Sequence, residues 1–435
     1  MCRLHTKGLA EPSSSSNTMV QQEQDGANTT LEPFPWDAGV FDAHCHPTDT
    51  MTSIASIPDM KACVLIVMST RSQDQDLVYE VASSHGVQNI EALSSSSDRL
   101  TAENRIIPSF GWHPWFSYQL VDDTGPNSTY DGTSAGKIAH YDKILAPSPS
   151  SRDISFSTGL PDPIPLSKFL TETRARLEAH PLALVGEIGV DKAFRLPMAW
   201  TSAHEAQRDD ELTPGGREGR LLSPHRVRVE HQAAVLQAQL KLAGQMGRPV
   251  SVHGVQAHGI LYETIAGSWK GHEKEVLSRR QQRQIAPGAE DFSSDSSDDE
   301  DSPPTTDPRI RKAMASSTKP AAGPREFPPR ICLHSYSGQV NQLKMYIHPS
   351  VPAKVYFSFS TAVNWGNGEE KTEEAVRATP DDRILVESDL HIAGEQMDQS
   401  LEDVCRKICQ IKGWDLREGV ERLARNWRAF VVGDE

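Results

Sequence analysis

The chain has 435 residues, 37% of them hydrophobic, and its formal net charge at pH 7 is −15. This length allows one large domain or two ordinary ones, and the low hydrophobic content favours a globular body that carries disordered insertions. The acidic balance argues against a protein that coats nucleic acid, and the absence of any run of 18 apolar residues excludes a transmembrane helix.

Residues 1–36 are rich in Ser, Gln and Asn and have no hydrophobic periodicity, so we expect a disordered N-terminal tail. The tail lacks the apolar stretch of a secretory signal. The six cysteines are scattered without the spacing of a disulfide framework, which favours reduced thiols. The sequence therefore predicts a cytoplasmic or nuclear protein.

From residue 40 onward, short apolar runs alternate with stretches of helical periodicity or polar composition. Continuous apolar runs favour parallel strands that are buried on both faces. Eight of them, interleaved with helices, predict a (β/α)8 barrel over residues 37–435, with a doubly wound sheet as the alternative. The runs lie at residues 40–43, 63–68, 106–110, 182–188, 250–252, 331–333, 355–359 and 384–386, and the predicted helices lie near 74–84, 224–246, 339–347 and 402–412.

Three polar insertions interrupt this pattern, at about residues 118–165, 195–224 and 270–328. The last contains "FSSDSSDDEDSPPTT", in which serines are flanked by acids. We expect this acidic loop to be disordered and open to phosphorylation. It either binds a protein partner or is simply a solvated loop, and its composition leaves both interpretations open.

Histidines and carboxylates follow the ends of most predicted strands. In a barrel these ends open on one face, where active sites are built. Four histidines and two carboxylates there can hold two cations with one carboxylate between them, and such ligands suit Zn or Mn better than Ca. Each one alone is more often a hydrogen-bonded core histidine or a helix cap, so the prediction depends on their joint placement. The histidines and carboxylates at or just after the predicted strand ends, from which such a set of six would come, are His44, His46, His113, Glu187, Asp191, His253, His334, Glu387 and Asp389.

The motifs around these residues resemble the TatD-type metal-dependent hydrolases. The resemblance covers residues 37–432 apart from the insertions, in the same order along the chain. The matching stretches are "HCH" at 44–46, "GWHP" at 111–114, "GEIGVD" at 186–191, the helix and strand that lead to His253, "HSYSG" at 334–338, "VESD" at 386–389 and "ARNWRAF" at 424–430.

The resemblance implies roles for individual residues. His44, His46 and Asp389 would hold one divalent ion (Zn, Mn or Mg), His253 and His334 the other, and Glu187 would bridge them. Glu187 and Asp389 would be the catalytic residues, with Asp389 orienting the attacking water and accepting its proton. His113 would contact the substrate phosphate. Tyr336, Trp112 or Trp115 are candidates to stack a terminal base, and core packing is the alternative for each.

Two departures from the family accompany these matches. The family usually carries an arginine soon after the histidine of the fifth strand, where this chain has "HGVQAHG", and a proline at the position of His391. One hypothesis is therefore an active dinuclear phosphodiesterase, a monomer that trims nucleic-acid ends, with DNA favoured over RNA. The other is a barrel that serves as an interaction scaffold through its acidic loop, with slow or lost catalysis. The insertions resemble a fungal branch described as partners of an anaphase-promoting-complex subunit.

Overall fold

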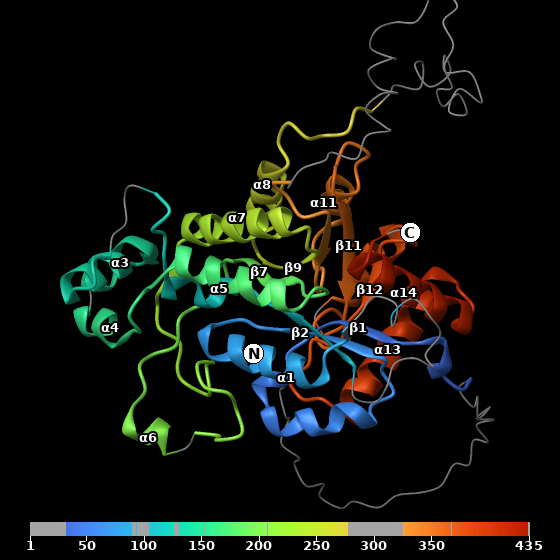
Figure 1. Ribbon diagram of the computed structural model, residues 1–435, viewed down its shortest axis with the longest axis horizontal. Helices are drawn as coiled ribbons and strands as arrows, with labels where there is room; N and C mark the ends of the chain where they lie inside the picture. The colour runs from blue at the N-terminus through green and yellow to red at the C-terminus, as the bar shows by residue number, and fades with distance from the viewer. Residues whose placement is uncertain are drawn as a thin grey trace, which may run out of the picture.

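Eight parallel strands form the centre of the computed structural model (Figure 1). The structure describes residues 32–88, 93, 104–125, 130–151, 153–206, 208–276, 325–366 and 368–433. Each predicted apolar run coincides with one strand, because these strands are buried on both faces. The strands are β1 (Phe41–Cys45), β2 (Val64–Met68), β3 (Ile106–Ser109), β7 (Val185–Asp191), β9 (Val250–Val255), β10 (Arg330–Leu333), β11 (Lys354–Phe359) and β12 (Ile384–Val386).

The eight strands follow one another in a ring. Ladders join them in two sheets, β1-β2-β3 and β12-β11-β10-β9-β7, and a parallel bridge between Ser109 and Leu184 links β3 to the start of β7. On the other side, the N–H of Asp389 donates to the carbonyl of His44 (3.0 Å), and the N–H of His46 donates to the carbonyl of Leu390 (2.8 Å). The predicted (β/α)8 barrel is confirmed. Among the described residues, these two are the only backbone hydrogen bonds that join the first and last strands, and they lie at or just past the strands' carboxyl ends.

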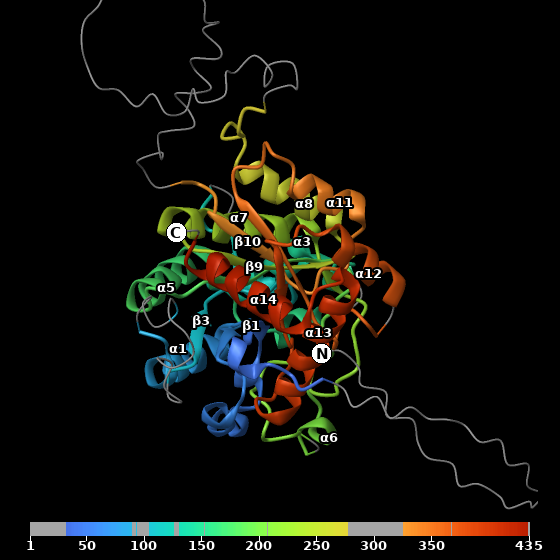
Figure 2. The ribbon, with the colours of Figure 1, turned by 90° about the vertical axis from the view of Figure 1, so that its right-hand side faces the viewer.

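Helices cover the outside of this ring (Figure 2). Helix α7 illustrates how the sequence sets their limits: it ends at Gly247, which adopts φ 65° and donates its N–H to Ala243 and Gly244. It begins later than the predicted residue 224 because residues 226–227 form a short strand instead. The outer helices are α1 (Ser72–His85), α5 (Leu166–Ala179), α7 (Val229–Met246), α8 (His258–Ser268), α11 (Val340–Tyr346), α12 (Glu369–Ala378), α13 (Glu395–Lys412) and α14 (Leu416–Val431).

The predicted insertion at 118–165 has secondary structure of its own. It contains α3 (Ser134–Ile144) and α4 (Ile154–Gly159), which project from one flank of the barrel (Figure 1), and the short strands β4 (Leu120–Val121), β5 (Leu145–Ala146) and β6 (Ile164–Pro165). Tyr141 and Phe156 help form a separate hydrophobic cluster there. The insertion at 195–224 contains α6 (Ser202–Glu205), followed by β8 (Arg226–Val227).

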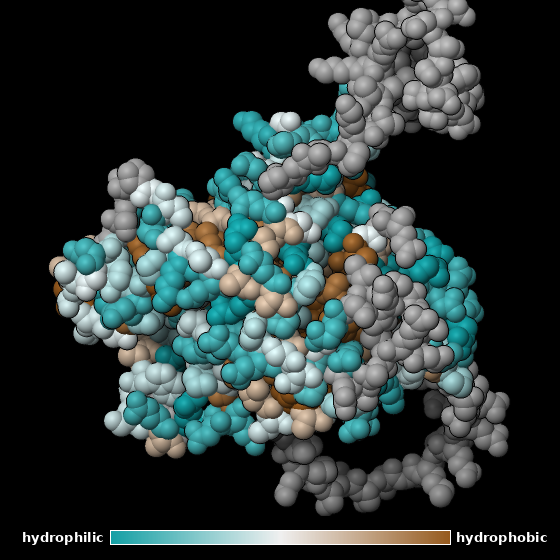
Figure 3. Space-filling model, in the orientation of Figure 1, coloured by the Kyte–Doolittle hydropathy of each residue, from teal (hydrophilic) through white to brown (hydrophobic). Residues whose placement is uncertain are grey.

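The predicted N-terminal tail ends earlier than residue 36. Phe34 and Trp36 pack against the main hydrophobic core, and residues 36–38 form a 3-10 turn. Residues 1–31 and 277–324 lie outside the described residues, so the predicted disorder of the tail and of the acidic loop stays a prediction. None of the described helices is both long and apolar enough to cross a membrane, and the face in Figure 3 is largely hydrophilic.

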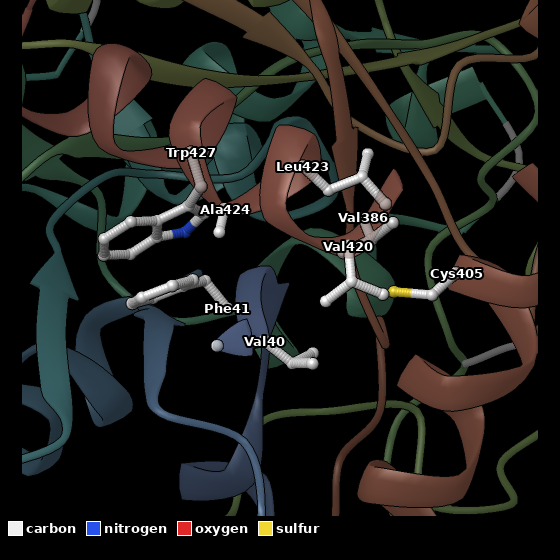
Figure 4. Close-up of a pocket in the computed structure, with 9 residues that line it drawn as sticks. Val40, Phe41, Val386, Cys405, Val420, Leu423, Ala424 and Trp427 are labelled. Atoms are coloured by element: carbon white, nitrogen blue, oxygen red, sulfur yellow. The ribbon is translucent and has the colours of Figure 1, made fainter. Parts of the chain in front are cut away.

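The end of the barrel opposite the strands' carboxyl ends is sealed by α14. Trp427 stacks on Phe41, with ring centroids 4.6 Å apart, and Figure 4 shows the two rings lying face to face. The cavity beside them, lined also by Val40, Val386 and Cys405, measures about 10 Å³. That is room for one water molecule at most, so this cavity is too small for a larger ligand.

Replacement of Trp427 tests this seal. Its indole is 1% exposed, and its Nε1 has no hydrogen-bond partner among the described residues. Trp427→Ala should lower the free energy of unfolding by about 3–5 kcal/mol, because a large cavity remains. Trp427→Phe keeps a ring on Phe41 and removes the unpartnered donor, so we expect less than half of that loss. Urea denaturation measures both, and equal losses would contradict the packing described here.

Candidate metal centre

Four histidines and two carboxylates converge where the strands end at the open face of the barrel. Each lies within one of the barrel strands or at most three residues after its end, and all the histidines are buried. The structure thus brings together the six residues that the sequence singled out as metal ligands. His44 is in β1 and His46 follows it, Glu187 is in β7, His253 is in β9, His334 follows β10 and Asp389 follows β12.

The carboxylate of Glu187 lies between two pairs of imidazoles. Its Oε2 is 3.5 Å from Nε2 of His44 and 3.4 Å from Nε2 of His46. Its Oε1 is 2.9 Å from Nδ1 of His253 and 2.8 Å from Nε2 of His334. Each oxygen of this carboxylate therefore faces its own group of imidazoles, two at Oε2 and three at Oε1, where Nε2 of His113 also lies 3.1 Å away.

Asp389 completes the first of these groups. Its Oδ1 lies 3.6 Å from Nε2 of His46 and 3.9 Å from Nε2 of His44. The backbone of Asp389 has φ 53°, a conformation that few residues adopt, and its N–H is bound to the carbonyl of His44. The same contact that closes the barrel therefore places this carboxylate.

Hydrogen bonds on the outer side orient two of the histidines. Nδ1 of His44 is 2.8 Å from the hydroxyl of Ser251, and Nε2 of His253 is 3.2 Å from Oδ2 of Asp191. In each ring the nitrogen that faces Glu187 is left free to bind a cation, as is usual for histidine ligands. The sequence did not single out Ser251, although it lies two residues before His253 on the same face of β9.

Glu387 takes the corresponding place behind His334. Its Oε1 is 3.6 Å from Nδ1 of His334 and accepts hydrogen bonds from the N–H (2.7 Å) and the hydroxyl (2.5 Å) of Ser335. Its Oε2 accepts a hydrogen bond from Ser358. This carboxylate is fully buried, and its hydrogen bonds come from Ser335 and Ser358, while its contact with His334 is longer than a hydrogen bond.

His113 enters the group in a different chemical state. Its Nε2 is 3.1 Å from Oε1 of Glu187, while its Nδ1 accepts the N–H of Trp115 at 3.1 Å. Burial lowers the pKa of His113 to about 4, so the ring is neutral near pH 7. Because Nδ1 is the acceptor, Nε2 carries the hydrogen. His113 therefore points a donor at the centre, which suits contact with an anion better than with a cation.

The predicted substrate contact of Tyr336 stays a prediction, and the structure buries this side chain. This residue is 4% exposed, its hydroxyl donates to the carbonyl of Gln339 and its ring packs against Phe357. The strand β10 ends at residue 333, and Ser335, just before Tyr336, adopts φ 40°. Trp112 is also buried, whereas Trp115 is half-buried.

The pKa values of the clustered residues favour an ionised carboxylate beside the protonated rings of His334 and His253. Burial alone would raise the pKa of Glu187, but the surrounding imidazoles hold it well below its usual value. Burial would lower the pKa of His334, but the charge and hydrogen bond of Glu187 raise it well above the usual value. The pKa of His253 is raised against burial in the same way, by Asp191 and Glu187. Without a cation, protons on these rings balance the carboxylate.

His391 stands where the family pattern has a proline. Its ring stacks over that of His46, with centroids 5.3 Å apart, and its Nδ1 is 2.8 Å from Oδ2 of Asp49. Asp49 in turn pairs with Arg71 at 3.0 Å. Arg71 is buried and also bound to Asp74, so it does not supply the arginine that is missing after His253.

Asp42 fixes the strands that carry the first group. It is fully buried; its Oδ1 accepts the N–H groups of His44 and Ser388, both at 3.0 Å, and its Oδ2 accepts the hydroxyl of Ser388 at 2.5 Å. One side chain of β1 therefore holds the end of β12. Burial raises the pKa of Asp42 to about 7.

Known proteins are similar to this chain over most of its length. A family model described as TatD related DNase matches residues 41–431. Cut9-interacting protein scn1 of Schizosaccharomyces pombe is 34% identical over 90% of this chain and 98% of its own. An uncharacterized deoxyribonuclease of Saccharomyces cerevisiae, YMR262W, is 24% identical over 90% and 99%. The solved structure of YJJV, a TatD homologue of Escherichia coli, covers 91% of this chain and 98% of its own, at 14% identity and a TM-score of 0.44.

Asp42→Asn should make the free energy of unfolding of the chelator-treated protein less dependent on pH. The pKa of Asp42 is about 7 in the folded chain, against an ordinary 3.8, so the folded state keeps a proton that the unfolded state releases between these values. Through this group, the free energy of unfolding falls as pH rises from about 4 to about 7, by up to about 4 kcal/mol. Asn does not ionise. Urea denaturation should therefore show wild type losing more stability than the variant over this range, and parallel losses would contradict the assignment.

Proposed function

Because the chain belongs to the family of TatD-related DNases, we propose that it is a metal-dependent phosphodiesterase that trims the ends of nucleic acids. The observation that supports this most directly is the position of Glu187, whose two carboxylate oxygens face separate groups of histidines. A carboxylate in that position suits a centre of two divalent ions that it bridges.

The proposed ligands divide into two groups. His44, His46 and Asp389 would hold one ion, His253 and His334 the other, and Glu187 would contribute one oxygen to each. Imidazole nitrogens combined with carboxylates fit Zn or Mn, and the carboxylates also accept Mg. Divalent ions held there would supply a water of lowered pKa as the nucleophile.

Two residues of the chain would handle the proton and the phosphate. The side chain of Asp389 is 16% exposed, more than that of Glu187 at 4%, so its carboxylate is the one that the attacking water can reach from the mouth. It would orient this water and accept its proton. His113, with its hydrogen on Nε2, would donate to a phosphate oxygen.

The proposed substrate is a strand end, and DNA is favoured over RNA. The printed name of the Saccharomyces cerevisiae relative, a deoxyribonuclease, supports this choice. With a net charge of −15, the chain has no general attraction for polyanions, so the phosphate must be held by local contacts at the centre. The half-exposed His391 ring beside His46 lies in the position for one such contact.

A second candidate function is supported by the other relative. That protein is named for an interaction with Cut9, and it matches this chain almost from end to end. We therefore also propose a protein partner, bound through the acidic insertion at about 270–328, whose serines lie among acids. The two functions are compatible, because the proposed centre lies at the mouth of the barrel and uses no residue of this insertion.

Glu187→Gln tests the first proposal. The change keeps the shape of the side chain and removes the charge that both ions would share, so the second ion should bind weakly. Hydrolysis of a labelled single-stranded oligonucleotide should fall at least about a hundredfold, roughly 2.7 kcal/mol of transition-state stabilisation. Glu326→Gln, the same change in an exposed pair with Lys241, is the matched control and should keep full activity.

The outcomes of this assay separate the two candidates. Chelator should abolish the activity of the wild type, and added Zn or Mn should restore it. A wild type without metal-dependent hydrolysis would leave the interaction role as the better account. A fully active Glu187→Gln variant would refute the bridged centre.

Metal affinity should depend on pH because cations must displace protons. The raised pKa values of His334 and His253 mean that the metal-free rings hold protons near neutral pH. Calorimetric titration with Zn²⁺ should show net proton release, seen as a heat that changes with the ionisation enthalpy of the buffer. Affinity should fall by about tenfold or more per pH unit below pH 7. Binding that is independent of pH and buffer would place the ions elsewhere.

A further inference from the structure

Two aromatic side chains form a stacked pair beside the metal centre. Trp115 follows β3, and Phe194 lies in the loop after β7, yet their rings are nearly parallel, with centroids 4.8 Å apart and an interplanar angle of 11°. The Trp115 ring also lies edge-on to His113 at 4.8 Å and to His253 at 6.0 Å. Through Trp115, the pair therefore adjoins two of the histidines that contact Glu187.

Asp191 fixes this pair with respect to the centre. Its Oδ2 accepts the indole N–H of Trp115 at 2.5 Å and lies 3.2 Å from Nε2 of His253. Its Oδ1 accepts the backbone N–H groups of Ala193 (2.6 Å) and Phe194 (2.9 Å). One buried carboxylate thus orients a proposed metal ligand and both aromatic residues.

Both members of the pair are half-buried, so each keeps part of its surface exposed. The Phe194 ring covers one face of Trp115, and no other aromatic ring contacts Phe194 among the described residues. Both side chains pack against the same hydrophobic cluster, and the indole N–H of Trp115 is engaged. The pair therefore offers a partly exposed apolar surface whose orientation is fixed.

We propose that Phe194, backed by Trp115, stacks the nucleobase of the nucleotide whose phosphate reaches the Glu187 centre. This inference rests on the proposed function. A base lies only one sugar away from its phosphate, and the pair lies directly beside the centre, at the edge marked by His113 and His253. Because every base has a π face, the contact would require a base at the strand end without selecting its identity.

The alternative role of the pair is rim packing only, and a substitution at Phe194 separates the two. The probe is a short single-stranded DNA of one sequence, with either a normal or an abasic terminal nucleotide. Phe194→Ala should weaken binding of the normal strand about tenfold, as loss of one stacking contact does. Phe194→Tyr should bind like wild type. Ile164→Ala, at another half-buried position of the same hydrophobic cluster, is the packing control and should also bind like wild type.

The abasic strand makes the test specific. Wild type should bind it about tenfold less tightly than the normal strand, and Phe194→Ala should bind both strands equally. In hydrolysis the same preference should appear in KM. A preference that persists in Phe194→Ala, or a wild type that shows none, would overturn the inference.

Failure of the proposed function gives a different result. If wild type distinguishes the two strands in binding, and this preference depends on Phe194, the stacking inference holds even when no cleavage occurs. If wild type cleaves both strands equally well with metal, the nuclease proposal holds and the inference fails. Thermal unfolding of each variant verifies that differences in binding are not differences in folding.

Discussion

The burial of the Glu187 carboxylate is the constraint on which the rest of the site depends. An ionised carboxylate away from water is tolerated only with partners, and here the partners are imidazoles from separate strands, among them His44, His253 and His334. A barrel can deliver these groups to one point because all its strands end at one face. Asp42 joins the end of β1 to the end of β12 and so closes the ring of strands. This closure fixes how far Asp389 lies from His44 and His46.

Much of this arrangement could be predicted from the sequence. Strands buried on both faces leave continuous apolar runs, so all eight were found, and the polar residues at their ends marked the six proposed ligands. The supporting residues were harder to find: Ser251 has no motif, and only its spacing from His253 on the strand indicated its direction. The burial of Tyr336 could not be predicted, because the left-handed turn at Ser335 is not visible in the sequence.

The insertions show that amino-acid composition alone does not predict which polar segments fold. A polar, Ser-rich stretch at 118–165 was predicted as a loop, yet a few apolar residues such as Tyr141 and Phe156 suffice to fold α3 and α4 against the barrel. Phe194, just before the next insertion, likewise gave no signal in the sequence. Its position depends on hydrogen bonds to Asp191 that only the folded chain displays.

The central claim is that one carboxylate bridges two ions, and anomalous diffraction tests it most directly. Crystals grown with Mn²⁺ or Zn²⁺ should show two anomalous peaks about 3.5–4 Å apart. One peak should lie next to His44 and His46, and the other next to His253 and His334, with an oxygen of Glu187 on each. A single peak at full occupancy, or two peaks that do not share Glu187, would contradict this account.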